Sequence, residues 1–108
     1  MGAATAPNGH EAEIRAIIFQ EGGIYVGQCL EYDIAAQSND LASLLDKLEL
    51  AVDAEFQTCL EKGCVARECI SPAPVYYHSL WDKRAVTLAR VGTPEAGKSI
   101  NYALAQAA

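Results

Sequence analysis

The chain has 108 residues, of which 51% are hydrophobic and 20% charged, and its formal net charge is −6. This length predicts one compact domain and excludes two halves with separate hydrophobic cores, while the composition excludes disorder over most of the chain. Every apolar run is much shorter than the roughly 20 residues that cross a bilayer, so we expect no membrane-spanning segment.

Residues 1–10 lack the basic start and the apolar run of a secretory signal, and they contain a Pro-Asn-Gly breaker. We therefore expect a flexible leader and a cytoplasmic protein. In a reducing cytoplasm the four cysteines are expected to stay free thiols. They are Cys29, Cys59, Cys64 and Cys69.

The last three cysteines have the spacing C-x4-C-x4-C, which is wider than the C-x2-C pairs of zinc fingers and ribbons. Only two histidines are present, His10 in the leader and His78. Two alternatives remain, a structural metal or thiols that simply pack, and the spacing favours packed thiols. We predict no metal site.

Acidic side chains are concentrated in the first part of the chain. Residues 1–66 contain eleven acidic and three basic side chains, a net charge of −8, whereas residues 67–108 contain five basic and three acidic ones. An acidic surface repels nucleic-acid phosphates and favours encounter with a basic protein, although solvated acids also simply aid solubility.

Three strands are predicted in the first part of the chain. Apolar residues alternate over 12–20, the glycine pair after Glu21 suits a hairpin turn, and aromatic and β-branched residues follow over 24–29. A third short strand is predicted over 34–37. Together these segments predict an antiparallel meander.

A long helix is predicted over residues 40–62. Ser38 or Asn39 suits its N-cap, and Gly63 suits the left-handed residue that ends a helix. Apolar side chains recur at intervals of three and four residues, which predicts one stripe that packs on the sheet. The stripe consists of Leu41, Leu44, Leu45, Leu48, Val52, Phe56, Cys59 and Leu60.

Shorter patterns predict the remaining elements. Residues 64–70 suit a strand, and a second helix is predicted over 76–81 after a Pro-rich break. Residues 85–91 alternate like a strand, and residues 99–108 have the composition of a short helix.

The second face of the sheet needs a cover. Ile17, Phe19 and Tyr25 are predicted to lie there and would otherwise expose a large apolar patch. We expect either a homodimer or packing by residues 76–81, which include Tyr76 and Trp81.

Residues 92–99 match the phosphate-binding pattern G-x-x-x-x-G-K-[ST]. Only nine residues follow Ser99, too few for the further strands and the magnesium-binding acid of a nucleotide-binding domain. Glu95 would also place a carboxylate among the phosphates. We predict a polar loop, no nucleotide binding and no cofactor.

Catalytic groups are also weakly represented. Glu31 and Asp33 lie at alternate positions, but a metal-dependent nuclease needs three or more convergent acids. His78, the histidine outside the leader, lies among aromatic residues in a segment that packing explains. We predict no catalytic residue.

The stretch 21–63 resembles the HicB antitoxin family. The matching positions are Gly23, Tyr25, Val26, Cys29, Glu31, Gln37 and the leucine-rich helix 41–52. The resemblance implies a partial RNase H-like fold without nuclease residues, dimerisation through the sheet, and a HicA-type partner, a small basic RNA-cleaving toxin.

The chain departs from the family pattern at Leu30, where a Pro is usual, and at Tyr32 and Asp33, which replace Pro-Gly. The loop at these positions is therefore expected to differ. Many members end in a helix-turn-helix or ribbon-helix-helix for operator DNA, and residues 97–101 carry little of either motif.

These observations predict an α+β fold of the order β-β-β-α-β: an antiparallel three- to four-stranded sheet with one long helix on one face, and a C-terminal extension with a short helix. The expected organisation is a leader over 1–10, a HicB-like core over 11–70 and an extension over 71–108 that packs on the core or on a dimer partner.

The expected function is non-catalytic binding of a basic, HicA-like toxin by an antitoxin-like homodimer. Six residues are predicted to bind the partner: the acids Glu31, Asp33, Asp46 and Asp53 and the aromatic anchors Tyr25 and Trp81. The alternative is a small-molecule sensor or orphan enzyme with a cleft between the sheet and the C-terminal segment. A neighbouring gene for a short basic RNA-binding protein would discriminate between the two.

Overall fold

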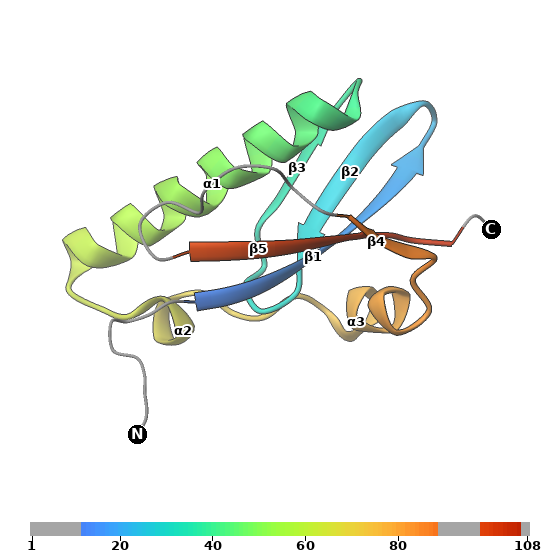
Figure 1. Cartoon of the computed structure of the whole chain (residues 1–108). Helices are drawn as coiled ribbons and strands as arrows, with labels where there is room; N and C mark the ends of the chain where they lie inside the picture. The colour runs from blue at the N-terminus through green and yellow to red at the C-terminus, as the bar shows by residue number, and fades with distance from the viewer. Residues whose placement is uncertain (1–11, 89–97, 107–108) are drawn as a thin grey trace.

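The computed structural model describes residues 12–88 and 98–106. Its elements are β1 (Ala12–Glu21), β2 (Ile24–Cys29), β3 (Ala35–Ser38), α1 (Leu41–Lys62), α2 (Ala66–Cys69), α3 (Val75–Asp82), β4 (Val86–Leu88) and β5 (Lys98–Leu104). The strands form one sheet of order β3-β2-β1-β5-β4, in which β1 and β5 are parallel and the other neighbours antiparallel. The α+β fold is confirmed, with a larger, mixed sheet (Figure 1).

The predicted meander is present. Gly22 and Gly23 have φ angles of 58° and 82°, which residues with a side chain rarely adopt, so the glycine pair makes the tight turn between β1 and β2. β2 then pairs with β3, with Tyr25 opposite Ser38 and Gln28 opposite Ala35.

Helix α1 begins one residue later than predicted and has a different cap. The Asp40 side chain accepts a hydrogen bond of 2.8 Å from the Ser43 N–H, so Asp40 is the N-cap in place of Ser38 or Asn39. Ser38 is unsuited to this role because it still belongs to β3. At the other end, Gly63 has a φ of 76° and ends the helix as predicted.

α1 packs on one face of the sheet. Leu44, Leu48 and Val52 are buried against the β1 side chains Ile14 and Ile18. The helix packs closely on β2 at a glycine, Gly27, where a Cβ atom would lie 3.2 Å from Leu48. The prediction that the stripe packs on the sheet was wrong for one member, Leu60. This side chain is 71% exposed, because it lies on the outer face of the helix near its end.

α3 covers part of the opposite face. Trp81 packs with Ile17, Leu30 and Ala103 in a second core cluster, so residues of the predicted 76–81 segment supply this cover. Tyr25 was predicted to lie here but packs against the α1-side core, since it shares the face of β2 that Gly27 presents to the helix.

Two predicted elements were wrong. Residues 64–70 contain the single helical turn α2, in which the N–H groups of Glu68 and Cys69 donate to the Val65 carbonyl. The predicted helix over 99–108 is replaced by β5, which lies between β1 and β4. The C-terminal segment thus completes the sheet, and its Tyr102 and Ala103 are buried on opposite faces.

Within the described residues, the helices are too short or too polar for any of them to span a membrane.

Candidate functional site

The structure divides the predicted partner-binding residues between two faces. Asp46 and Asp53 are exposed on α1, and Tyr25 lies half-buried beneath the same layer. Trp81 lies on the opposite face of the sheet and is only 9% exposed. The six residues therefore do not form one surface, and Trp81 serves the core.

Glu31 is engaged within the protein. Its carboxylate accepts hydrogen bonds from the Arg15 backbone N–H at 2.7 Å and from Arg15 Nε at 2.6 Å. Asp33, two residues further on, accepts a hydrogen bond of 3.0 Å from the Gln28 side-chain amide. These acids hold the segment after β2 against the sheet.

Trp81 has two cationic neighbours. The Arg84 Cζ lies 4.8 Å from the centre of the indole ring and the Arg15 Cζ lies 5.7 Å from it, distances at which a guanidinium is attracted to the ring electrons. Between α3 and the sheet, the side chains of Trp81, Ile17 and Leu30 pack together in one core cluster.

The outer face of α1 carries an exposed stripe that mixes apolar and acidic side chains. Its members recur at intervals of three and four residues and therefore line one side of the helix. They are Asp46, Leu50, Asp53, Gln57 and Leu60, called here the α1 outer stripe. Leu50 is 68% and Leu60 71% exposed, on the side of the helix that faces away from the sheet.

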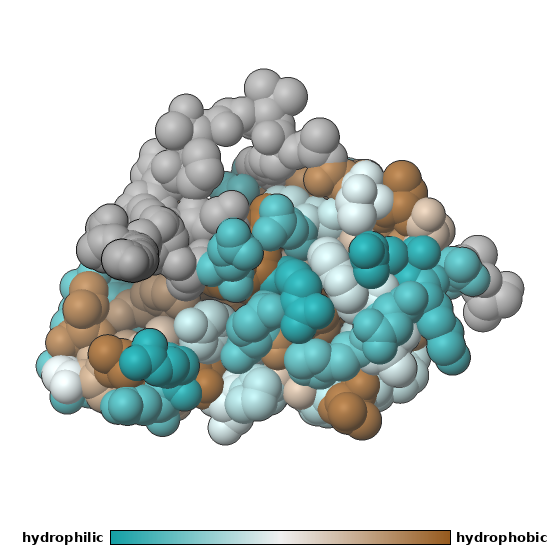
Figure 2. Space-filling view, turned by 60° about the horizontal axis from the view of Figure 1, so that its bottom comes forward, coloured by the Kyte–Doolittle hydropathy of each residue, from teal (hydrophilic) through white to brown (hydrophobic). Residues whose placement is uncertain are grey.

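On the face that carries α2 and α3, hydrophobic residues appear as several separate patches among hydrophilic ones (Figure 2). Val75 and Tyr76, at the start of α3, are the most exposed apolar side chains of that helix.

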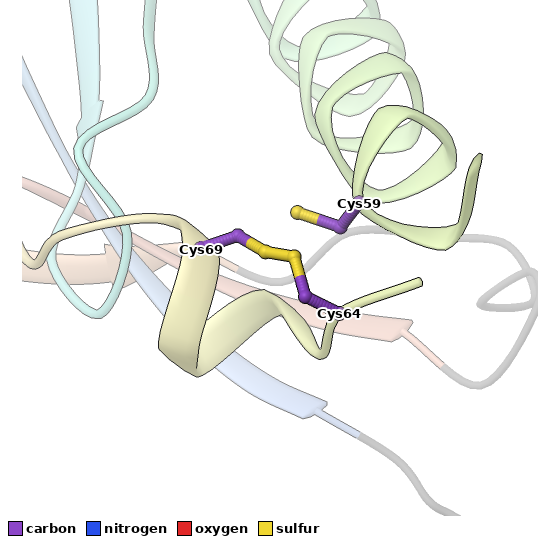
Figure 3. Close-up of side chains that lie close together, drawn as sticks. All are labelled: Cys59, Cys64 and Cys69. Carbon is purple, nitrogen blue, oxygen red and sulfur yellow. A yellow bond between two sulfur atoms is a disulfide. The ribbon is translucent and has the colours of Figure 1, made fainter. Parts of the chain in front are cut away.

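Three cysteines meet where α1 ends. Cys59 is buried in the last turns of α1, Cys64 follows the Gly63 turn and is half-buried, and Cys69 is exposed at the end of α2. Figure 3 shows the Cys59 sulfur pointing toward the other two, and the three sulfurs lie within 4.8 Å of one another. We call these residues the cysteine cluster.

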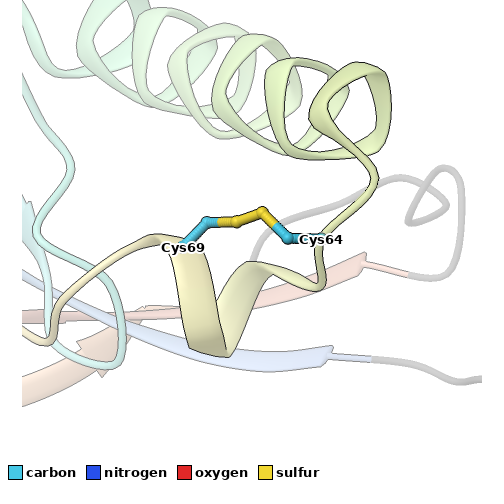
Figure 4. The surroundings of a disulfide bond; sticks show 2 residues. All are labelled: Cys64 and Cys69. Carbon is cyan, nitrogen blue, oxygen red and sulfur yellow. A yellow bond between two sulfur atoms is a disulfide. The ribbon is translucent and has the colours of Figure 1, made fainter.

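Two of these thiols are oxidised. Cys64 and Cys69 form a disulfide (Figure 4), so the prediction of four free thiols was wrong for this pair, while Cys29 and Cys59 are free. The spacing alone did not indicate the pairing. Cys64 precedes the single turn of α2 and Cys69 ends it, and the hydrogen bonds from the Glu68 and Cys69 N–H groups to the Val65 carbonyl fold the chain so that the two residues meet.

Cys29 lies in the core between the sheet and α1. Burial, and to a lesser degree the negative charge of Glu31, raise the pKa of the Cys29 thiol from 9.0 to about 12. In the native protein this thiol therefore stays protonated under conditions in which the unfolded chain ionises it.

This difference predicts alkaline destabilisation. Below pH 9 both states hold the proton; between pH 9 and 12 only the native state does, so the free energy of unfolding falls as the pH rises. We expect Cys29 to contribute a decline of roughly 1.4 kcal/mol per pH unit in this range. Urea unfolding at pH 8 to 11 measures it, and a wild-type slope in Cys29→Ala would contradict the assignment.

The pattern at residues 92–99 falls mostly outside the described residues. Its last two positions, Lys98 and Ser99, begin strand β5. In a phosphate-binding loop the Lys-Ser pair instead opens a helix whose N–H groups face the phosphates.

No protein-family model, curated protein or solved structure matches this chain.

Proposed function

We propose that this protein is a non-catalytic, antitoxin-like binding module whose α1 outer stripe docks on a small basic protein of the RNA-cleaving HicA type. The observation that carries the proposal is the pair of exposed leucines, Leu50 and Leu60, set among acids on the outer face of α1. The HicB resemblance of residues 21–63 supplies the kind of partner.

The charge of the helix supports a basic partner. α1 contains five acidic and two basic side chains. Acids at the rim of a contact speed association with a positive surface and make it sensitive to salt. A partner that binds RNA must present such a positive surface.

The exposed leucines support a contact that lasts longer than an electrostatic encounter. Leu50 and Leu60 are ten residues apart, about 15 Å along the helix axis, so both can enter one groove or two nearby pockets of a partner. Since Trp81 is buried, these leucines replace it as the apolar anchors in the proposal.

The test begins with a search, beside the gene of this chain in its host, for a gene that encodes a small basic protein. We expect the purified pair to form a complex and the RNA cleavage of the basic protein to stop. The double variant Asp46→Lys, Asp53→Lys should weaken the complex at least tenfold at low salt, and Leu50→Ala should speed its dissociation. Binding kinetics at two salt concentrations measure both effects.

The control variant Glu13→Lys, Glu21→Lys makes the same change in net charge at two exposed positions of β1. It should bind nearly as well as the wild type. Equal weakening by both double variants would show that net charge alone acts, and unchanged affinity in the α1 variant would rule out this helix face.

The resemblance also implies a homodimer that forms through the sheet. We propose a contact on α3 instead, because Val75 and Tyr76 are 82% and 61% exposed and offer a second apolar surface away from the α1 outer stripe. We expect Tyr76→Asp to shift the protein from dimer to monomer in sedimentation equilibrium. A monomeric wild type, or an unchanged dimer in the variant, would remove this surface from the proposal.

A further inference from the structure

The cysteine cluster has no role in the proposed binding function, and its geometry points to a different ligand. Its three sulfurs come from the end of α1, the turn after Gly63 and the end of α2, and all lie within 4.8 Å of one another. Three sulfurs bound to one tetrahedral zinc ion at about 2.3 Å are about 3.8 Å apart. Small side-chain movements therefore suffice to turn the cluster into a metal site.

We propose that Cys59, Cys64 and Cys69 bind one Zn²⁺ ion when the protein is reduced, and that the disulfide between Cys64 and Cys69 is the oxidised, metal-free state of the same site. Thiolates are soft ligands, and a set made of sulfur alone selects thiophilic ions such as zinc over Mg²⁺ or Ca²⁺.

The backbone around the cluster fixes the distance between its parts. Gly63 turns the chain, and the Cys64 N–H donates a hydrogen bond of 3.0 Å to the Cys59 carbonyl. The N–H groups of Cys69 and Ile70 donate to Val65 and Ala66 and close the turn of α2. Because these bonds involve only the backbone, they are compatible with either state of the sulfurs.

The burial of the ligands is graded. Cys59 is buried, Cys64 half-buried and Cys69 exposed, so the cluster opens toward solvent on the Cys69 side. In the described part of the chain the cluster consists of three ligands, which leaves the fourth position of a tetrahedral ion to water or to a ligand from solution.

The two states interconvert by balanced steps. A dithiol reductant transfers two electrons and two protons to the Cys64 and Cys69 sulfurs, the S–S bond breaks, and the dithiol becomes a disulfide. Zn²⁺ then forms three Zn–S bonds and releases the three thiol protons to water. Hydrogen peroxide reverses the change: it accepts two electrons from the Cys64 and Cys69 thiolates and two protons from water and becomes two water molecules, while the S–S bond re-forms. The ion then leaves, and the Cys59 thiolate takes up a proton.

The experiment uses the full chain, reduced, stripped of metal and kept under inert gas. Zn²⁺ is titrated against a coloured chelator, and Co²⁺ serves as the spectroscopic probe. We expect one ion per chain, thiolate-to-cobalt charge-transfer absorption and the intense visible bands of tetrahedral cobalt. The oxidised protein should bind neither ion until a dithiol is added.

Cys59→Ser and Cys69→Ser should each weaken zinc binding more than the roughly 100-fold that loss of a second-shell partner costs. Cys69 is exposed, so its substitution leaves the core intact, and circular dichroism checks the fold of each variant. The matched control is Cys29→Ala, which removes a thiol outside the cluster and should bind zinc like the wild type.

Three results would overturn the proposal: no zinc binding by the reduced wild type, wild-type affinity in Cys59→Ser, or equal affinity in the oxidised and reduced proteins. Loss of binding in Cys29→Ala to the same extent as in Cys69→Ser would also overturn it, because the metal would then not depend on this cluster.

Discussion

Replacing Leu48 by Asp is expected to unfold the protein. Leu48 is fully buried between α1 and the sheet, and its methyl group lies in the close contact with Gly27. An aspartate there buries an unpaired charge and removes the packing of a leucine, at a cost of about 4 kcal/mol or more. A domain of this size has a stability of roughly 5–15 kcal/mol, so this cost removes most of the stability if the protein lies near the lower end of the range, as small domains do.

The matched control lies two residues away. Leu50→Asp makes the same chemical change on the exposed face of α1 and should alter the free energy of unfolding by less than about 1 kcal/mol. Phe56→Asp, at a half-buried position, should fall between the two. Thermal and urea unfolding measure all three, and similar melting temperatures for Leu48→Asp and the wild type would refute the packing described for α1.

Removal of residues 98–108 is expected to prevent folding altogether. This truncation deletes β5, which pairs with β1 over seven positions from Ala12 opposite Lys98 to Ile18 opposite Leu104. It leaves one edge of β1 without hydrogen-bond partners, separates β4 from the sheet, and takes Tyr102 and Ala103 out of the two core clusters. The free-energy cost of leaving buried backbone groups unpaired and of opening both core clusters exceeds the total stability of a small domain.

Circular dichroism and the dispersion of amide NMR signals measure this result. Tyr102→Phe is the graded control. It keeps the ring in the core and removes only the hydroxyl group that donates a hydrogen bond of 3.1 Å to Glu49, so it should cost about 1 kcal/mol. A truncated chain that melts cooperatively near the wild-type temperature would show that residues 1–97 fold without β5 and would contradict the role assigned to this strand.

The sequence by itself determined the elements whose signals are local. The alternation over 12–20 and the glycine pair after it predicted the β1–β2 hairpin, because strand pleating and a positive-φ turn act over a few residues. The period of α1 and its end at Gly63 followed from contacts three and four residues apart. The apolar character of residues 76–81 likewise predicted that this segment would pack.

The tertiary structure alone decided the elements whose partners are distant in sequence. Residues 99–108 have the composition of a short helix, but 98–104 form a strand because the edge of β1, more than 80 residues earlier, pairs with their backbone. Three further features also depend on tertiary packing. They are the burial of Trp81, the pairing of Glu31 with Arg15 and the proximity of the three cysteines. Side-chain chemistry can be read along a chain, but which groups become neighbours depends on how sheet, helix and turn pack together.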